Sequence, residues 1–253
     1  MDLWSNNPLE RLAAARDSEI VANWPQRIGN TAPMKPWPYG MPCSINPFVV
    51  FLGKSPGNSP AAGDADYLVR PPYALPTAGV RHPKLDCSDA RGYWVRVREL
   101  GSVIVKRYAP AMSEQDAHAL IGQLNLGTGA FGQAKEAPLE KDYCRWVPDV
   151  LMDYLKPCYL ILVGLNGLKK SNGEFDPCNR LRIDWNRPEV EFPFVAYTPS
   201  QYRFRLWKRK RSDGRTMNIV MWPQHPCRAP MTNSRTWQES GREFIRHPWA
   251  GIR

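Results

Sequence analysis

Two short segments of the 253-residue chain combine polar side chains with tight turns. Residues 53–58 (GKSPGN) follow the apolar run 48–52, and residues 225–230 (HPCRAP) follow the apolar run 219–222. Pro and Gly at these positions are strong signals of a turn. A turn that follows a buried parallel strand lies where α/β sheets bind their ligands. We therefore expect both segments to border a binding site.

The first segment is not a phosphate-binding P-loop. That loop requires a glycine, four residues and then Gly-Lys-Ser/Thr. The chain has Gly53, Lys54 and Ser55, but Phe48 stands where the first glycine is needed. Pro56 would also interrupt the helix that must follow. The segment therefore argues against a nucleoside triphosphatase.

The two segments together resemble the paired signatures of the uracil-DNA glycosylase superfamily. In that family a G-x-[D/N/A/E]-P-[G/Y/A] loop after the first core strand faces an H-P-S loop after the last one. Here residues 53–57 read GKSPG and residues 225–227 read HPC. Residues 72–79 (PYALPTAG) resemble the family's P-F-x-G-x-A-G stretch, and residues 151–164 resemble its helix, proline, strand and glycine. The resemblance covers about residues 45–245.

The resemblance implies an enzyme that flips a base out of DNA and hydrolyses its bond to the sugar. Negative charge then develops on the departing base, and a hydrogen-bond donor fixed at the base oxygen stabilises it. By its match to the motif, His225 supplies that donor. Its alternative interpretation is a structural or solvated loop histidine.

Ser55 is the clearest departure from the family pattern. The family has an Asp, Asn, Glu or Ala at this position, and the acidic or amide residue positions or activates the attacking water. A serine hydroxyl can orient a water, but it cannot act as a general base near pH 7. Either leaving-group stabilisation is sufficient, or a carboxylate such as Asp64 or Asp66 assists. Ser55 is equally compatible with a turn-capping role.

The resemblance also implies a pocket for the flipped base. Tyr73 matches the aromatic residue that stacks on the base, with Tyr67 as the fallback and a packed loop tyrosine as the alternative. Asn125 matches the base-reading amide, and its alternative is a helix C-cap. The complete predicted set of base-binding residues is Gly53, Pro56, Gly57, Asn58, Tyr73 and Asn125.

The formal net charge is +10, which favours polyanionic partners. Basic residues concentrate in 203–215, around a Ser-Asp-Gly turn signal that predicts a hairpin. We interpret them as contacts to DNA phosphates; the alternative is an edge strand protected by charge. Arg228 is a candidate wedge for the base stack, with Met231 as the alternative. The predicted DNA contacts are Lys54, Arg203, Arg205, Lys208 and Arg228.

Strands that alternate with helices indicate an α/β fold, which we expect to be a three-layer α/β/α sandwich around a short, mostly parallel sheet. The expected unit is a single domain over 1–253, with an N-terminal extension 1–44 and an insertion around 57–110. The apolar runs 48–52 and 159–163 predict buried strands. Further predicted strands are 93–98, 202–210 and 217–222. The predicted helices are 9–22, 114–124, 146–155 and a last one that begins at 232 or 233 and ends at about 246.

Composition limits the cofactors and the compartment. Six cysteines form no C-x-x-C pair and only four histidines are present, so we expect no metal and no other cofactor. No apolar run approaches the ~20 residues of a membrane span, and the first 15 residues lack an apolar stretch. The expectation is a soluble, cytoplasmic monomer that binds DNA and no membrane.

The target base is left open by the sequence. Ser55, the long segment 57–92 and the loose match at Asn125 suggest a pocket unlike that for uracil. One hypothesis is removal of bulky modified cytosines from invading phage DNA. Two other classes remain: a catalytically inactive nucleic-acid-binding protein of the same fold, and a hydrolase of free nucleosides.

Overall fold

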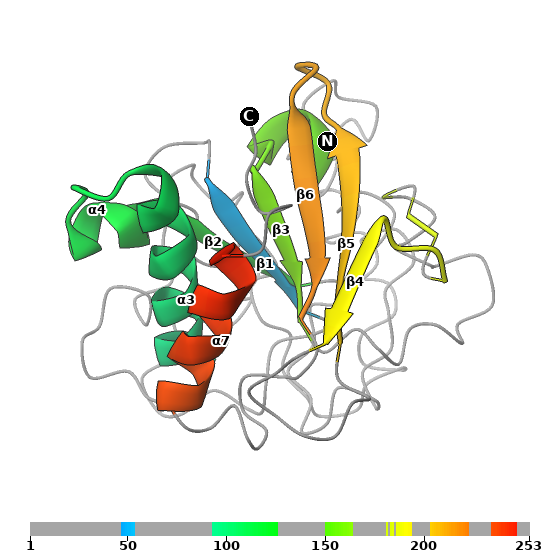
Figure 1. Ribbon diagram of the computed structural model, residues 1–253. Helices are drawn as coiled ribbons and strands as arrows, with labels where there is room; N and C mark the ends of the chain where they lie inside the picture. The colour runs from blue at the N-terminus through cyan, green and yellow to red at the C-terminus, as the bar shows by residue number, and fades with distance from the viewer. Residues whose placement is uncertain are drawn as a thin grey trace, which may run out of the picture.

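The computed structural model describes residues 47–53, 93–125, 150–163, 181, 183–184, 186–193, 203–222 and 234–246. In the described part, helices separate the first three strands, and the last three strands follow one another before a final helix (Figure 1). In chain order they are β1 (Val49–Gly53), α3 (Tyr93–Tyr108), α4 (Glu114–Ala119), β2 (Ile121–Asn125), the π-helix η2 (Val150–Leu155), β3 (Tyr159–Leu162), β4 (Val190–Pro193), β5 (Arg203–Lys210), β6 (Thr216–Met221) and α7 (Ser234–Arg246).

The strands form one six-stranded sheet in the order β2-β1-β3-β6-β5-β4. The β2-β1-β3-β6 block is parallel throughout. The β6-β5-β4 block is antiparallel, and a hairpin joins β5 to β6. A sheet of this kind, with helices packed on it, confirms the predicted α/β class. The predicted single domain over 1–253 stays a prediction.

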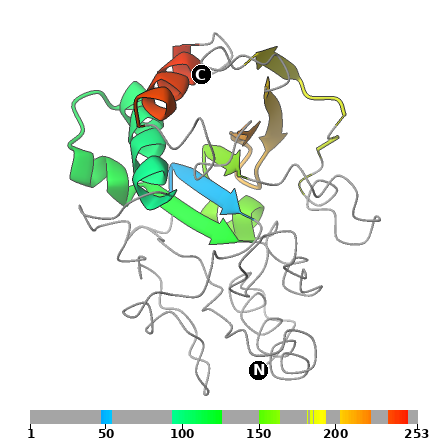
Figure 2. The same ribbon diagram turned by 90° about the horizontal axis from the view of Figure 1, so that it is seen from below.

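Helices α3 and α7 lie side by side against one face of the sheet (Figures 1 and 2). Val97 and Ile104 of α3 and Phe244 of α7 are fully buried there. They share a core with alternate residues of the strands, including Phe51 and Ile161. The alternation follows from strand geometry, because successive side chains point to opposite faces.

The second face of the sheet is buried as well. Leu52, Leu160 and Ile219 point to this side and have no exposed surface. Trp207 is also fully buried, and its indole N–H donates a hydrogen bond of 2.8 Å to the backbone oxygen of Asp184. Strands that are apolar on both faces are typical of a covered parallel sheet. The three-layer sandwich itself stays a prediction.

The strand predicted at 93–98 is wrong, because these residues begin helix α3. Alternating valine and arginine over six residues mimics a strand. Over the full 16 residues, however, the buried positions Val97, Leu100 and Ile104 recur at helical spacing. The short window therefore favoured the wrong period.

The helix predicted to run from 114 to about 124 ends at Ala119. Its beginning is as expected, since the Asp116 backbone N–H donates to the Ser113 hydroxyl at 3.1 Å. After Leu120 the chain enters β2, where pairing with β1 replaces helical hydrogen bonds. Asn125 is therefore the last residue of a strand and not a helix C-cap.

Other predicted elements are confirmed where the structure describes them. The strands at 48–52 and 159–163, the hairpin and the last helix are present within one or two residues of the expected bounds. Of the helix predicted at 146–155, the described part is η2. The predicted helix 9–22 lies outside the described residues.

Candidate functional site

Four parallel strands end at one edge of the sheet, which we call the carboxyl edge. Their register aligns Leu124, Leu52, Leu162 and Met221 in a single row across β2, β1, β3 and β6. In Figure 1 the arrowheads of β1, β3 and β6 all point to the bottom of the view. The chain therefore leaves every parallel strand on the same side, where α/β sheets bind ligands.

Gly53 and Asn125 are neighbours at this edge. They are the last residues of β1 and β2, and they are partners in the parallel register. Paired strands lie about 4.8 Å apart. The structure thus brings together two of the predicted base-binding residues that are 72 positions apart in the chain.

The strands that precede the two motifs are separated by β3 alone. The Val163 N–H donates to Leu52 O at 2.9 Å, and the Trp222 N–H donates to Leu162 O at 3.1 Å, so the pairing extends to the very end of each strand. Two strand spacings put the ends of β1 and β6 about 10 Å apart. The predicted site residues beyond these strand ends lie outside the described residues: Lys54, Ser55, Pro56, Gly57, Asn58, Tyr73, His225 and Arg228.

Trp222 fixes the end of β6, three residues before His225. Its side chain is fully buried, and its ring meets Phe204 edge-on with centroids 4.7 Å apart. Phe244 of α7 also packs on it, with the ring centroids 5.5 Å apart. Sequence reasoning missed this anchor, although a tryptophan directly before the Pro-Gln-His-Pro segment was a visible signal. The departure point of the His225 segment is therefore held by close aromatic packing.

Three arginines of β5 lie on the same face of the sheet as Met221 of β6. We call Arg203, Arg205 and Arg209 the arginine row. Glu191 of β4 lies 3.8 Å from Arg203 and 3.4 Å from Arg205, and Glu189 lies 3.1 Å from Arg209. The exposed side chain of Lys208 points to the opposite face. Sequence reasoning placed these basic residues together but did not find their acidic partners, of which Glu191 lies in β4 and Glu189 directly precedes it.

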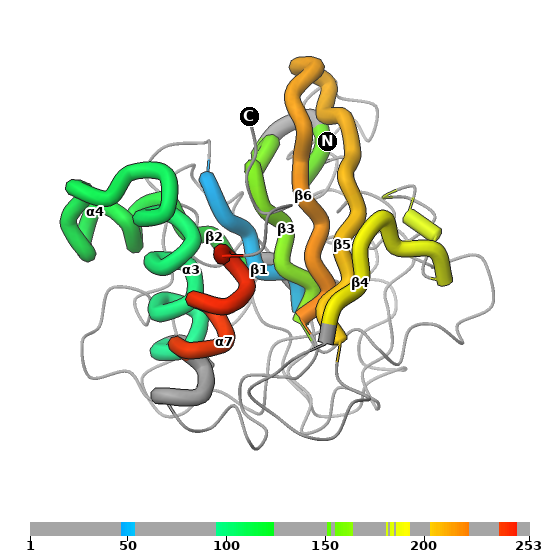
Figure 3. Tube along the Cα trace, in the orientation of Figure 1, coloured from blue at the N-terminus to red at the C-terminus, as the bar shows by residue number. Residues whose placement is uncertain are grey.

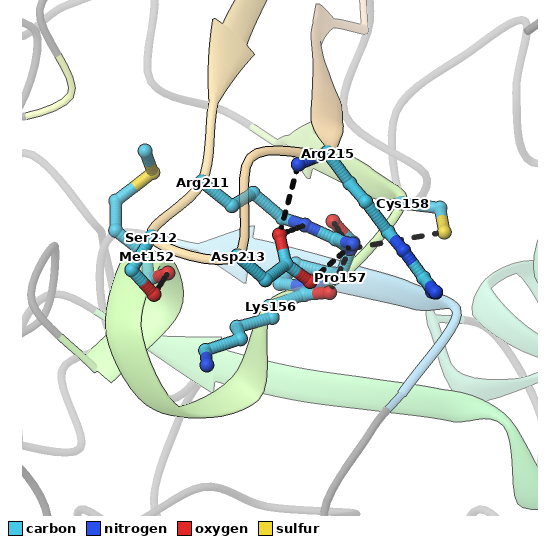
Figure 4. Close-up of polar contacts among 8 residues, drawn as sticks. All are labelled: Met152, Lys156, Pro157, Cys158, Arg211, Ser212, Asp213 and Arg215. Atoms are coloured by element: carbon cyan, nitrogen blue, oxygen red, sulfur yellow. Dashed lines mark hydrogen bonds and ion pairs between the residues drawn. The ribbon is translucent and has the colours of Figure 1, made fainter.

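Arg211, also part of the basic segment, is a structural residue (Figure 4). Its side chain is 4% exposed and makes two hydrogen bonds to Asp213, of 3.0 and 2.8 Å. The same guanidinium donates to the backbone oxygens of Lys156 and Pro157. We call these groups the Arg211 network. It ties the β5–β6 turn to the start of β3.

The Arg211 network lowers the pKa of the Asp213 carboxyl. Desolvation raises its pKa, but the hydrogen bonds from the Arg211 side chain and the Arg215 backbone outweigh that effect and hold the pKa below its usual value. The carboxylate is therefore the form that the folded chain prefers.

The part of the chain that the structure describes contains neither a metal-binding cluster nor a membrane-spanning helix. No three His, Cys, Asp or Glu side chains lie close enough together to hold a metal ion. No described helix has the length and apolar character to cross a membrane.

Comparison of the chain with models of known protein families finds no match, and a search of curated proteins finds no similar sequence. The family resemblance therefore rests on the motifs themselves.

Proposed function

We propose that this protein is a monofunctional DNA glycosylase, which flips a modified pyrimidine out of DNA and hydrolyses its N-glycosidic bond, leaving an abasic site. One observation carries the proposal: the strands that lead into the two motifs end at one edge, with only β3 between them. The pairing of Gly53 with Asn125 at that edge adds support. Two turns that start about 10 Å apart can border one nucleobase.

The proposed chemistry divides between the two turns. His225 donates a hydrogen bond to the base oxygen as negative charge develops there. Ser55 orients the attacking water. Anchoring of Trp222 in the core gives the His225 turn a fixed starting point, and electrostatic stabilisation depends on donors whose positions are fixed before the reaction.

A bulky modified cytosine is the proposed target, with a role in defence against phage. A small serine in place of a carboxylate, and the long segment 57–92, favour a roomier pocket than uracil requires. DNA is the proposed partner, and a cytoplasmic monomer is the proposed state.

The test is incubation of the protein with duplexes that contain uracil, hydroxymethylcytosine or glucosylated hydroxymethylcytosine, followed by alkali cleavage at abasic sites. We expect cleavage at a modified cytosine. His225→Ala should lower the rate about 10²- to 10³-fold, the usual cost of losing one such donor, with DNA affinity retained. His118→Ala is the matched control, because His118 lies on α4 beside Glu114, and it should leave the rate unchanged.

Two results would overturn parts of this proposal. Cleavage at uracil alone would remove the modified-cytosine assignment. Cleavage of free nucleosides but not of duplexes would replace DNA by a small substrate.

Ser55 favours a second candidate, a nucleic-acid-binding protein that has lost the chemistry. Such a protein would bind DNA with a steep dependence on salt and yield no abasic sites with any duplex.

A further inference from the structure

The solvent exposure of the arginine row decreases from Arg203 to Arg209. The exposed fraction of the side chain is 49% at Arg203, 30% at Arg205 and 25% at Arg209. Because β5 is antiparallel to β6, Arg205 pairs with Met221 at the carboxyl edge, whereas Arg209 pairs with Met217 near the start of β6. Within the row, accessibility therefore rises toward the proposed site.

One carboxylate faces the two arginines nearest the carboxyl edge. Glu191 is the register partner of Arg205, and its Oε1 is within 4 Å of the Nε atoms of Arg203 and Arg205. At 3.8 and 3.4 Å these contacts are longer than a charge-assisted hydrogen bond of about 2.8 Å. The Glu191 side chain is itself 30% exposed. The Arg205 Nε–H donates to Glu191 Oε1 only at 3.4 Å. Exposed ion pairs of this kind contribute little to stability, so another anion can replace the carboxylate at low cost.

The pair of Glu189 with Arg209 is built differently. Oε1 of Glu189 accepts from Arg209 at 3.1 Å and also from the Lys208 backbone N–H at 2.9 Å. Because it accepts from a backbone N–H of β5, the Glu189 carboxylate helps to hold the chain before β4 against β5. It lies further from the carboxyl edge than Glu191, so it offers a matched comparison on the same side of the sheet.

We propose that Glu191 competes with DNA phosphate for Arg203 and Arg205, and so limits how tightly the surface beside the site holds DNA of any sequence. This inference rests on the proposed function. A phosphate that binds the two arginines must displace the carboxylate, and the displaced Glu191 then repels the incoming backbone. A protein that searches DNA benefits from such a limit, because contacts to the backbone alone carry no sequence information.

The test measures the Kd of a short fluorescein-labelled duplex by anisotropy over a series of salt concentrations. Each exposed pair is worth about 1.5-fold to fivefold in an equilibrium, so the loss of both pairs in Glu191→Gln should tighten binding about twofold to 25-fold. The slope of log K against log salt should steepen by up to about 0.9 for each additional phosphate that the variant neutralises. Glu189→Gln removes the same charge from the same region and should change Kd much less.

Three further measurements make the result specific. Glu191→Asp keeps the charge but shortens the side chain by one methylene, so it should tighten binding less than Glu191→Gln does. The double variant Glu191→Gln/Arg205→Gln should lose most of the added affinity. Thermal unfolding of each variant verifies that the fold is retained.

Equal tightening by Glu189→Gln and Glu191→Gln would mean a general effect of net charge and would overturn the proposal. So would an unchanged Kd for Glu191→Gln, or tighter binding that survives in the double variant. If the wild type still produces abasic sites in these cases, the proposed function stands without this inference. If no variant binds DNA and no abasic sites form, both fail.

Discussion

Charged and polar side chains at the amino ends of the parallel strands are more buried and more closely paired than those at the carboxyl edge. At the edge where β3 begins, Arg211 is buried and bonded to Asp213 and two backbone oxygens. Nearby, the hydroxyls of Tyr108 and Tyr159 are 2.5 Å apart, and burial raises the pKa of Tyr159. At the carboxyl edge, Arg203 is half exposed and its carboxylate partner is 3.8 Å away.

The charged residues at the two ends of the β5–β6 hairpin therefore have different roles. Figure 3 shows the β5–β6 hairpin with its turn at the top, opposite the ends of the parallel strands. At the turn, the cation holds the fold together. At the other end, cations are accessible beside the strand that leads to His225. Charge density along a sequence therefore does not distinguish accessible cations from a buried structural network.

The largest expected effect is on the structural side of this comparison. Arg211→Met leaves Asp213 and the backbone oxygens of Lys156 and Pro157 without this donor, so we expect a loss of about 3 kcal/mol in the free energy of unfolding. Arg209→Met removes an arginine from a partly exposed pair and should cost under about 1 kcal/mol. Urea unfolding of both variants measures the contrast. Equal losses would contradict the division of tasks along the hairpin.

A second prediction concerns the close approach of α3 to β2. A Cβ added at Gly101 would lie 2.3 Å from Cδ1 and 2.7 Å from Cγ1 of the buried Ile121. Gly101→Ala should therefore destabilise the fold by about 1–3 kcal/mol, although alanine favours a helix. At Gly241 in α7 the nearest atom would be a leucine methyl at 3.0 Å, so Gly241→Ala should be close to neutral. Thermal unfolding distinguishes the two; a neutral Gly101→Ala would show that β2 is not packed this tightly.

The smallest expected effect is the pH dependence of the Arg211 network. Because the pKa of Asp213 is lower in the folded chain than the ordinary 3.8, its contribution is present above that pH and is lost as the pH falls through the folded value. Asp213→Asn should therefore flatten the acid side of the stability profile while it lowers stability at neutral pH. Unfolding measured from pH 6 to pH 2 tests this. Parallel profiles for wild type and variant would contradict it.

The sequence predicted the elements whose signals are local and continuous. Strands β1 and β3 are apolar on both faces, and the turn of the β5–β6 hairpin has Gly214 at a positive φ of 79°, as its turn signal indicates. Helix α3 was missed because its first six residues alternate, and its helical period appears only over a longer window.

Contacts between segments that are distant in the chain could not be predicted from the sequence. The pairing of Glu191 with Arg205, and of Gly53 with Asn125, depends on which strands become neighbours in the sheet. Strand order is set by tertiary packing, so no local pattern contains it. The burial of Arg211 likewise follows from its contact with residues about 55 positions earlier in the chain.

We propose that residues 53–58 and 225–228 border one cavity at the carboxyl edge. The most direct measurement is an amide NMR titration of the labelled protein with a short duplex that contains an abasic site, the product of the proposed reaction. If the two segments form one site, the amide signals of Gly53, Asn125 and His225 should shift together, while those of Ser212 to Arg215 should not. Shifts at the β5–β6 turn with none at Gly53 and His225 would contradict it.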